Sequence, residues 1–150
     1  MDSQIRREIL RILAQHRIMS LATVRPDGWP QVTTVGYAFD ALTLYFLCAR
    51  HSQKAANLAR DERVSLTIDH DTDQVMQIRG LSMAARAHSV PDPVEADAAL
   101  RLLLARYPQQ NALPLTAPSP AEVHIFRVTP TVISVLDYSK GFGHTELVHC

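Results

Sequence analysis

The sequence L-T-L-Y-F-L-C-A-R-H-S-Q-K-A-A-N-L-A-R-D-E-R-V-S-L-T-I (42–68) contains a strand pattern, a helix pattern and a second strand pattern in direct succession. Residues 42–48 and 64–68 are rich in β-branched, aromatic and aliphatic side chains, which favour strands. The segment between them begins with His51 and Ser52, either of which could cap a helix, and continues with helix-forming residues. A mixed structure in which a short helix separates two strands is therefore expected here.

Further helices and strands are predicted before and after residues 42–68. Spacing and turn residues predict further elements: a helix at 3–16, strands at 18–25 and 30–37, a strand at 74–87, a helix from Asp92 to Tyr107, and strands at 123–128 and 131–137. Asp92 is a suitable N-cap because Pro93 and Glu95 follow it. Gly80 inside the longest strand predicts a bulge or a close backbone approach.

Seven short strands, most of them neighbours in sequence, predict an antiparallel meander. Such a sheet removes its exposed edges most economically by closing on itself. We expect a mainly β fold with added helices, in which a small antiparallel barrel has helices at its ends or gaps. The proline-rich stretch 108–120 is expected to be a loop, and the polar, glycine-containing stretch 138–150 to be a flexible tail.

Size and composition indicate one globular domain over residues 1–150. The chain has 47% hydrophobic and 20% charged residues, which is ordinary for a folded protein. Fifteen basic residues balance fifteen acidic ones, so nucleic acid and anionic membranes are not expected partners, whereas self-association is permitted. We expect a cytoplasmic protein, because there is no signal-peptide pattern, no long apolar run and only two cysteines, Cys48 and Cys150.

Common hydrolase, nucleotide and metal motifs are absent from the sequence. There is no G-x-S-x-G, H-E-x-x-H, C-x-x-C, P-loop or G-x-G-x-x-G pattern. The seven histidines show no metal-ligand spacing. The acidic segment 69–73 lacks the later residues of a calcium loop, so we interpret it as a hairpin turn.

The start of the helix at 51–60 is a candidate phosphate site. A helix N-terminus offers unpaired N–H groups and a partial positive charge. Ser52 would add a hydroxyl group and Lys54 a full positive charge, which is unfavourable at this end of a helix unless an anion binds there. A plain serine cap followed by a surface lysine is the alternative interpretation.

The strand Q-V-T-T-V (31–35) is the second candidate, because it carries polar side chains on both faces. At the mouth of a barrel these groups could form hydrogen bonds with a planar polar ring. An exposed edge strand that uses threonine for its β-propensity is equally consistent with the pattern.

Together these segments resemble the flavin-binding split-barrel proteins, the superfamily of pyridoxamine phosphate oxidase. The resemblance covers roughly residues 3–137 and includes M-S-L-A-T-V-R-P-D-G-W-P (19–30). The block S-x-K-x-x-N-L that begins at Ser52, followed by V-S-L, is its most specific part. The ending L-D-Y-S-K-G-F-G-H-T (136–145) is similar to a subgroup called oxidase-like, and it lacks the Arg- and His-bearing motif that grips the substrate phosphate in true pyridoxamine phosphate oxidases.

The resemblance implies a split β-barrel of the FMN-binding type and a set of cofactor contacts. The ring and ribityl portions would lie against Gln31, Val32, Thr33 and Thr34. The phosphate end would lie against Leu47, Cys48, Ser52, Gln53 and Lys54. Gln74 would match a glutamine that contacts the ring from the partner subunit. Family members commonly have arginine where this chain has Gln31 and Gln53, so positive charge is missing at the phosphate end, and Arg50 is a candidate to replace it.

The resemblance also implies a homodimer with two cofactor sites at the interface. The expected function is an FMN-dependent oxidoreductase that acts on a small-molecule substrate or electron donor, with no side chain assigned as catalytic. Two alternatives remain: a haem-binding protein, with His144 or another histidine as axial ligand, and a reductase that uses a deazaflavin coenzyme. Tyr138, Lys140, Phe142 and His144 could form a lid, or belong only to a disordered end.

Overall fold

The computed structural model of the protein describes residues 1–108 and 122–150. Its helices are α1 (Ser3–Gln15), α2 (Gln53–Arg60) and α3 (Pro93–Ala105), with short 3₁₀ turns η1 (Val75–Gln77) and η3 (Tyr138–Lys140). Its strands are β1 (Ile18–Val24), β2 (Pro30–Gly36), β3 (Ala38–Asp40), β4 (Thr43–Ala49), β5 (Arg63–Asp69), β6 (Arg79–Ser89), β7 (Val123–Asp137) and β8 (Thr145–His149). No helix in these described ranges is long and apolar enough to span a membrane.

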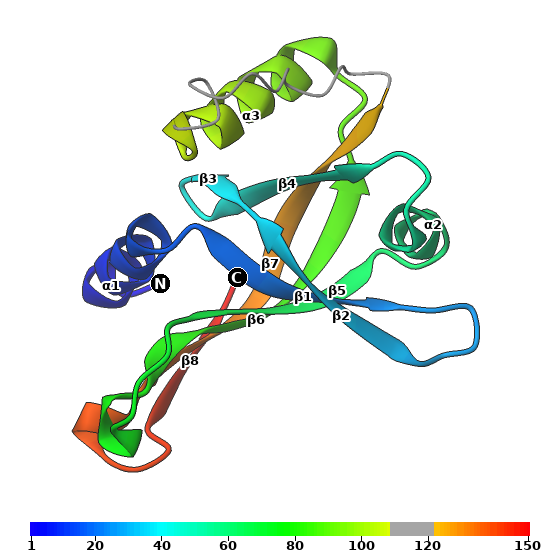
Figure 1. The fold of residues 1–150 in the computed structure, drawn as a ribbon. Coiled ribbons are helices and arrows are strands. Elements are labelled where there is room, and N and C mark those ends of the chain that lie inside the picture. The colour runs from blue at the N-terminus through cyan, green and yellow to red at the C-terminus, as the bar shows by residue number, and fades with distance from the viewer. Residues whose placement is uncertain (109–121) are drawn as a thin grey trace.

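All eight strands belong to one antiparallel sheet that curls into a split barrel (Figure 1). The strand order is β2-β1-β5-β6-β7-β4-β3, and β8 pairs with β7 beside this path. Strands β2 and β3 are separated only by Tyr37, yet β2 pairs with β1 and β3 pairs with β4. The chain at Tyr37 therefore joins the two ends of the strand order. The expected small antiparallel split barrel with added helices is confirmed.

Tyr37 holds this corner in place. Its side chain is fully buried, and its hydroxyl donates to the carbonyl oxygens of Leu13 at 2.7 Å and His16 at 3.0 Å. Its backbone N–H donates to the carbonyl of Arg17. Because these acceptors lie at the end of α1 and just beyond it, the corner of the barrel is fixed to the first helix. Burial raises the pKa of the Tyr37 hydroxyl to about 12.

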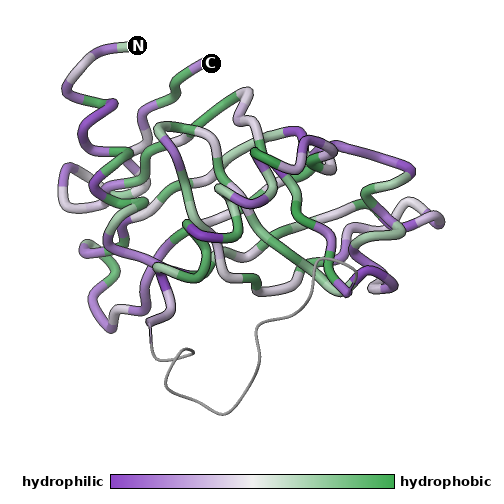
Figure 2. Tube along the Cα trace, turned by 90° about the horizontal axis from the view of Figure 1, so that it is seen from above, coloured by the Kyte–Doolittle hydropathy of each residue, from purple (hydrophilic) through white to green (hydrophobic). Residues whose placement is uncertain are grey.

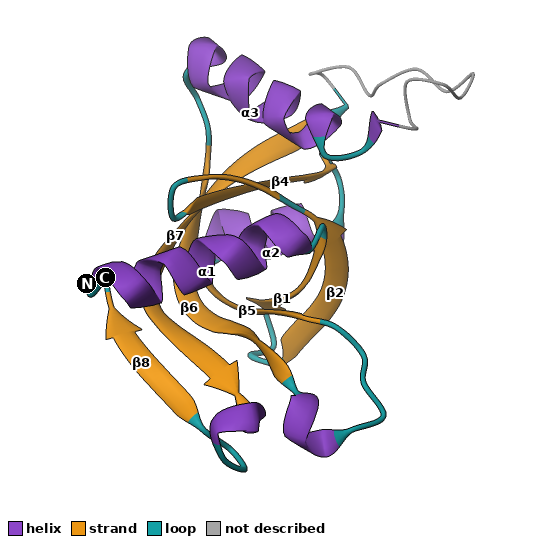
Figure 3. Ribbon diagram, turned by 90° about the vertical axis from the view of Figure 1, so that its left-hand side faces the viewer, coloured by secondary structure: helices purple, strands orange, loops and turns teal. Residues whose placement is uncertain are grey.

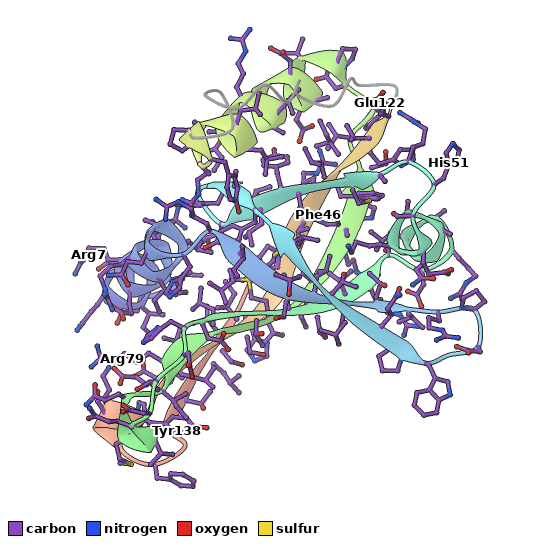
Figure 4. The ribbon with its side chains drawn as sticks, in the orientation of Figure 1. Arg7, Phe46, His51, Arg79, Glu122 and Tyr138 are labelled. Carbon is purple, nitrogen blue, oxygen red and sulfur yellow. The ribbon has the colours of Figure 1, made fainter. Side chains whose placement is uncertain are left out.

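Helices α1 and α2 lie at opposite ends of the barrel, and α3 packs outside β3, β4 and β7 (Figures 1 and 3). The core between them is aliphatic and aromatic, with Phe46 near its centre stacked on Phe126 at a ring separation of 5.3 Å (Figure 4). Hydrophobic stretches run along the strands that enclose this core, while the turns at the periphery are mostly hydrophilic (Figure 2). Each strand buries one of its faces in the core, so apolar side chains gather along the strands and polar side chains in the turns.

Three local predictions are confirmed. Ser52 caps α2, because its Oγ accepts the N–H of Ala55 at 3.1 Å. Asp92 caps α3, and Pro93 is the first residue of that helix. Gly80 is a point of close backbone approach: a Cβ there would lie 2.5 Å from the carbonyl oxygen of Ile68 on the paired strand.

Two predicted boundaries are wrong. The strand predicted over 74–87 begins only at Arg79, and the residues before it form η1. The strands predicted at 123–128 and 131–137 are one continuous strand, β7, which passes through Pro130. Pro130 pairs with Ala85 at the point where the β6–β7 register shifts. A proline lacks the N–H that a regular ladder requires, and a bulge removes that requirement.

The expectation of an irregular tail over 138–150 is also wrong. These residues form η3 and then β8, which pairs with the second half of β7 from Val132 to Leu136. Val148 is buried in this pairing, with 7% of its surface exposed. The loop predicted over 108–120 lies, beyond Pro108, outside the described residues.

Candidate functional site

A polar cleft lies between the β1–β2 hairpin and the start of α2. Its volume is about 510 Å³, and it is lined by Arg25, Pro26, Asp27, Gln31 and Gln53. Gln31 and Gln53 come from segments more than twenty residues apart, and the structure brings them together at this cleft. These are the two positions at which the resemblance leads one to expect arginine.

A buried asparagine connects the two glutamines. Asn57 is fully buried, and its Oδ1 accepts from Gln53 Nε2 at 2.8 Å. Its Nδ2 donates to Gln31 Oε1 at 3.2 Å and to the buried Thr23 Oγ1 at 3.0 Å. Thr23 and Gln31 are direct partners in the β1–β2 register. One side chain of α2 therefore fixes the helix to both strands of the hairpin and orients both cleft glutamines.

Ser52, Lys54 and Cys48 form a second group at the same helix end. The Ser52 hydroxyl lies close enough to the Cys48 thiol to hydrogen-bond it, and the charge of Lys54 acts on that thiol too. Both partners favour the thiolate, but burial outweighs them and raises the pKa of Cys48 above its ordinary value. The Cys48 side chain is therefore a neutral thiol near neutral pH. The Lys54 ammonium group forms no ion pair with a carboxylate among the described residues.

Strand β2 presents polar groups to both sides, as predicted. Val32 is 64% exposed on one face, and Thr34 is exposed on the same face. On the other face, Thr33 Oγ1 is shielded from solvent and has no hydrogen-bond partner within the described part of the chain. A buried hydroxyl without a partner is costly and points to a missing one.

An apolar cavity of about 380 Å³ adjoins this strand. Thr34 of β2 and Leu47 of β4 line it, together with side chains of α3 and neighbouring positions: Ile18, Val35, Gly36, Leu100, Leu103, Leu104 and Tyr107. Among residues 1–108 and 122–150, no charged side chain lines the cavity. The predicted contacts on β2 and β4 therefore face an apolar environment at Thr34 and Leu47, and a polar one at Gln31.

Gln74 and Arg50 line neither the polar cleft nor the apolar cavity. Gln74 is exposed and precedes η1, which packs against η3 on the far side of the molecule from α2 (Figure 1). Arg50 contacts strand β7, where its guanidinium lies 2.8 Å from His124 Nε2 and donates to the carbonyl of Val123 at 3.2 Å. It does not line the polar cleft, so the structure does not place it where it would replace the missing positive charge.

Two residues of the site were missed by sequence reasoning. Arg25 lines the cleft and pairs with Asp27 at 2.9 Å, with both side chains about half exposed. Only its position before the Pro26-Asp27-Gly28 turn could have indicated this, since the turn folds the hairpin back toward α2. Asn57 was visible within the S-x-K-x-x-N-L block, and its spacing of four from Gln53 places the two side chains on one helix face.

The described residues fit a phosphate-bearing ring cofactor in part. Lys54, which has no carboxylate partner, and the Arg25 guanidinium could hold a phosphate. The Thr33 hydroxyl, which has no hydrogen-bond partner, and the apolar cavity at Thr34 and Leu47 could hold a ring. Ser52 Oγ accepts a backbone N–H, so its hydroxyl hydrogen, which can now bond the Cys48 thiol, could turn to an anion instead. The replacement of arginine at Gln31 and Gln53 leaves neutral amides rather than cations at the cleft.

The tail histidine is poorly placed as a haem ligand within one chain. His144 Nε2 is shielded from solvent and lies 3.7 Å from Glu146 Oε1. An axial ligand must present a nitrogen lone pair to the iron, and Nε2 of His144 is not accessible from solvent. Tyr138 and Phe142 pack edge to face at 5.6 Å, so the segment forms local contacts of its own.

Comparison with solved structures shows the same fold in several proteins. A Listeria innocua protein provisionally described as a pyridoxamine 5'-phosphate oxidase is 20% identical, with a TM-score of 0.73 over 89% of this chain and 98% of that one. A conserved hypothetical protein of Mycobacterium tuberculosis is 27% identical, with a TM-score of 0.76 over 97% and 91% of the two chains. A haem-binding protein of Mycobacterium smegmatis is 17% identical, with a TM-score of 0.78 over 99% of this chain and 59% of that one.

The family described as Pyridoxamine 5'-phosphate oxidase matches residues 5–137, which include the hairpin, the β4–α2 junction and the whole of β7. The match agrees with the barrel and with the motif that begins at Ser52. This chain therefore belongs to the pyridoxamine 5'-phosphate oxidase family of split-barrel proteins.

Proposed function

We propose that the protein is an FMN-binding oxidoreductase that acts on a small molecule or accepts electrons from one. The observation that carries this proposal is that β2 meets the start of α2 at the polar cleft and meets the end of β4 at the apolar cavity, while Cys48 of β4 lies beside Ser52 and Lys54 of α2. These are the segments that the resemblance assigns to the ring, the ribityl chain and the phosphate. The family match over residues 5–137 supports the same assignment.

The phosphate end would bind at the N-terminus of α2. Ser52 would donate its hydroxyl hydrogen, and Lys54 would supply a charged hydrogen bond. The first N–H groups of an α-helix have no acceptor within the helix, so they add further donors. The chain offers Arg25 as an additional cation at the cleft, where it would have to exchange Asp27 for the phosphate.

The ring would lie along β2, with Thr33 and Thr34 beside it and Leu47 toward the apolar cavity. Thr33 would then gain the hydrogen-bond partner that its hydroxyl lacks. FMN, when bound, supplies hydride or electron transfer by itself, so the protein needs to provide position, electrostatics and access rather than an acid or base. We therefore assign no catalytic side chain.

A homodimer would complete the site. Strand β2 is an end strand of the sheet order, so one of its edges has no strand paired to it. Trp29, which precedes β2, and Val32 on one face of β2 are 70% and 64% exposed, so two large apolar side chains are available to a partner near this strand. Gln74, which lies far from the cleft in its own subunit, would reach the ring of the other subunit.

A haem-binding function is the second candidate, and its support is the similarity in fold to the haem-binding protein of Mycobacterium smegmatis. The shielded nitrogen of His144 argues against that residue as the ligand. A deazaflavin coenzyme is a third candidate, because Gln31 and Gln53 carry no positive charge.

The absorbance spectrum of the freshly purified protein, followed by a titration with FMN, tests the proposal. We expect the two visible bands of an oxidised flavin, either at once or after addition of FMN. A Soret band without flavin would favour the haem function. Binding of a deazaflavin coenzyme but not of FMN would favour the third candidate.

A further inference from the structure

Two histidines from distant parts of the chain meet beside the C-terminal end of α1. His16 is the C-cap residue directly after α1, and His70 follows β5. Their rings stack with centroids 5.6 Å apart and planes inclined by 18°. Nε2 of His16 lies 3.4 Å from Nδ1 of His70. Neither residue belongs to the candidate cofactor site.

The tautomer of His16 follows from its other contact. Nδ1 of His16 lies 2.8 Å from the carbonyl oxygen of Ile12, which can only accept a hydrogen bond. Nδ1 therefore carries the proton in the neutral ring, and the lone pair of Nε2 faces Nδ1 of His70, which can donate a hydrogen bond to it when no metal is bound. A backbone carbonyl that holds one ring nitrogen while the other is left to bind is the usual arrangement of a metal-ligating histidine.

The nitrogen separation matches that of a tetrahedral metal site. Zinc binds imidazole nitrogen at about 2.0–2.1 Å, so two such ligands at the tetrahedral angle are about 3.3–3.4 Å apart. The observed 3.4 Å equals this separation, and the two rings, whose nitrogens now face each other, would have to turn until both lone pairs point at one ion. Water would complete the coordination, because no group of three or more ligating side chains occurs within residues 1–108 and 122–150.

Acidic residues flank His70 in the sequence. His70 lies in the acidic turn that also contains Asp69, Asp71 and Asp73. His16 lies at the C-terminal end of α1, where the helix dipole favours a cation. Arg17 and Arg106 are the nearby cations, and their guanidinium groups donate to backbone carbonyls, those of Arg106 and His16 respectively.

The anchor of the pair is rigid. The carbonyl of His16 accepts hydrogen bonds from Tyr37 and Arg106, which hold the end of α1 against the barrel corner. We propose that His16 and His70 form a binding site for a divalent metal ion of the type that prefers imidazole, such as Zn²⁺ or Ni²⁺. The ion would connect the end of α1 to the end of β5, and neutral imidazole would be required on both sides.

Calorimetric titration of the tag-free, EDTA-treated protein with ZnCl₂ and with NiCl₂ at pH 7.5 tests the proposal. We expect one ion per chain, and binding that is lost at pH 5, because protonated imidazole cannot coordinate. His16→Gln and His70→Gln should each lower the affinity by at least about tenfold, and His51→Gln should leave it unchanged. Unaltered binding in both of the first two variants, or no binding at 1 mM metal (roughly the weakest affinity that counts as a site), would overturn the proposal.

A second measurement keeps the test independent of folding defects in the variants. In the unmodified protein, long-range ¹H–¹⁵N correlation of the imidazoles should show that Zn²⁺ shifts Nε2 of His16 and Nδ1 of His70. Shifts confined to the other histidines would place the metal elsewhere and contradict the proposal.

Discussion

Nδ2 of Asn57 lies 3.2 Å from Oε1 of Gln31, so a fully buried asparagine of α2 is bonded to the edge strand of the barrel. The same side chain contacts Thr23 and Gln53. The position of the helix N-terminus relative to β2 thus depends on one amide group. Since the proposed phosphate and ring contacts lie on these two elements, Asn57 is a positioning residue for the candidate site.

Asn57→Ala should destabilise the protein and weaken FMN binding together. It removes three hydrogen bonds and leaves the buried Thr23 hydroxyl without its partner, which should cost about 1–3 kcal/mol of unfolding free energy. Urea denaturation monitored by circular dichroism measures this. Gln15→Ala, which truncates an exposed amide on α1, serves as the control and should change stability little. Equal stability of both variants would show that the Asn57 network contributes nothing.

Lys54→Ala should weaken the binding of FMN but not that of riboflavin, because only FMN carries the phosphate. Loss of a charged hydrogen bond predicts ~1.5–3 kcal/mol of binding free energy. Fluorescence titration with both flavins measures the difference, and Arg7→Ala, which removes an exposed cation on α1, is the control. If FMN affinity is unchanged, or if both flavins lose affinity equally, Lys54 does not bind the phosphate.

Gly80→Ala should destabilise the β5–β6 pair. The added Cβ would lie 2.5 Å from the Ile68 carbonyl oxygen, which is backbone and cannot move without disturbing the ladder. Overpacking of this kind costs about 1–3 kcal/mol. The denaturation midpoint of the variant should therefore fall, while that of Ser82→Ala on the same strand should change much less. A midpoint equal to that of the unmodified protein would show that the strands can separate locally without cost.

The buried Tyr37 should make the fold sensitive to alkali. Its pKa is about 12 in the folded protein against an ordinary value of 10, so the unfolded chain loses this proton first as the pH rises. Unfolding therefore becomes progressively easier between pH 10 and pH 12. Tyr37→Phe should have a shallower decline in stability over this window than the unmodified protein, as measured by urea denaturation at each pH. Parallel curves would assign the alkaline sensitivity to other groups.

The fold could be predicted from the sequence where local signals and tertiary structure agree. Ser52 and Asp92 cap helices because their side chains accept hydrogen bonds from backbone N–H groups two or three residues further along the chain. Contacts over such short separations can be predicted from the local sequence. Gly80 was also identifiable, since a glycine inside an apolar strand needs a reason. These features depend on few distant residues.

Errors arose where distant partners override local preference. Pro130 normally ends a strand, but the register shift at Ala84 and Ala85 accommodates it in β7. Residues 145–149 are too short a run to indicate a strand by themselves, and they form β8 because β7 extends past β4 and offers an edge for pairing. The hairpin turn places Arg25 at the polar cleft, and the folded barrel places His16 beside His70. Neither position could be predicted from spacing in the sequence.

The crystal structure of the protein grown with FMN tests the central claim most directly. The proposal predicts a dimer in which the FMN phosphate lies within hydrogen-bond distance of Ser52 and Lys54, with the ring between the two subunits against β2. A single unpaired subunit, or a dimer whose interface around Ser52 and Lys54 is filled only by packed side chains, would contradict it.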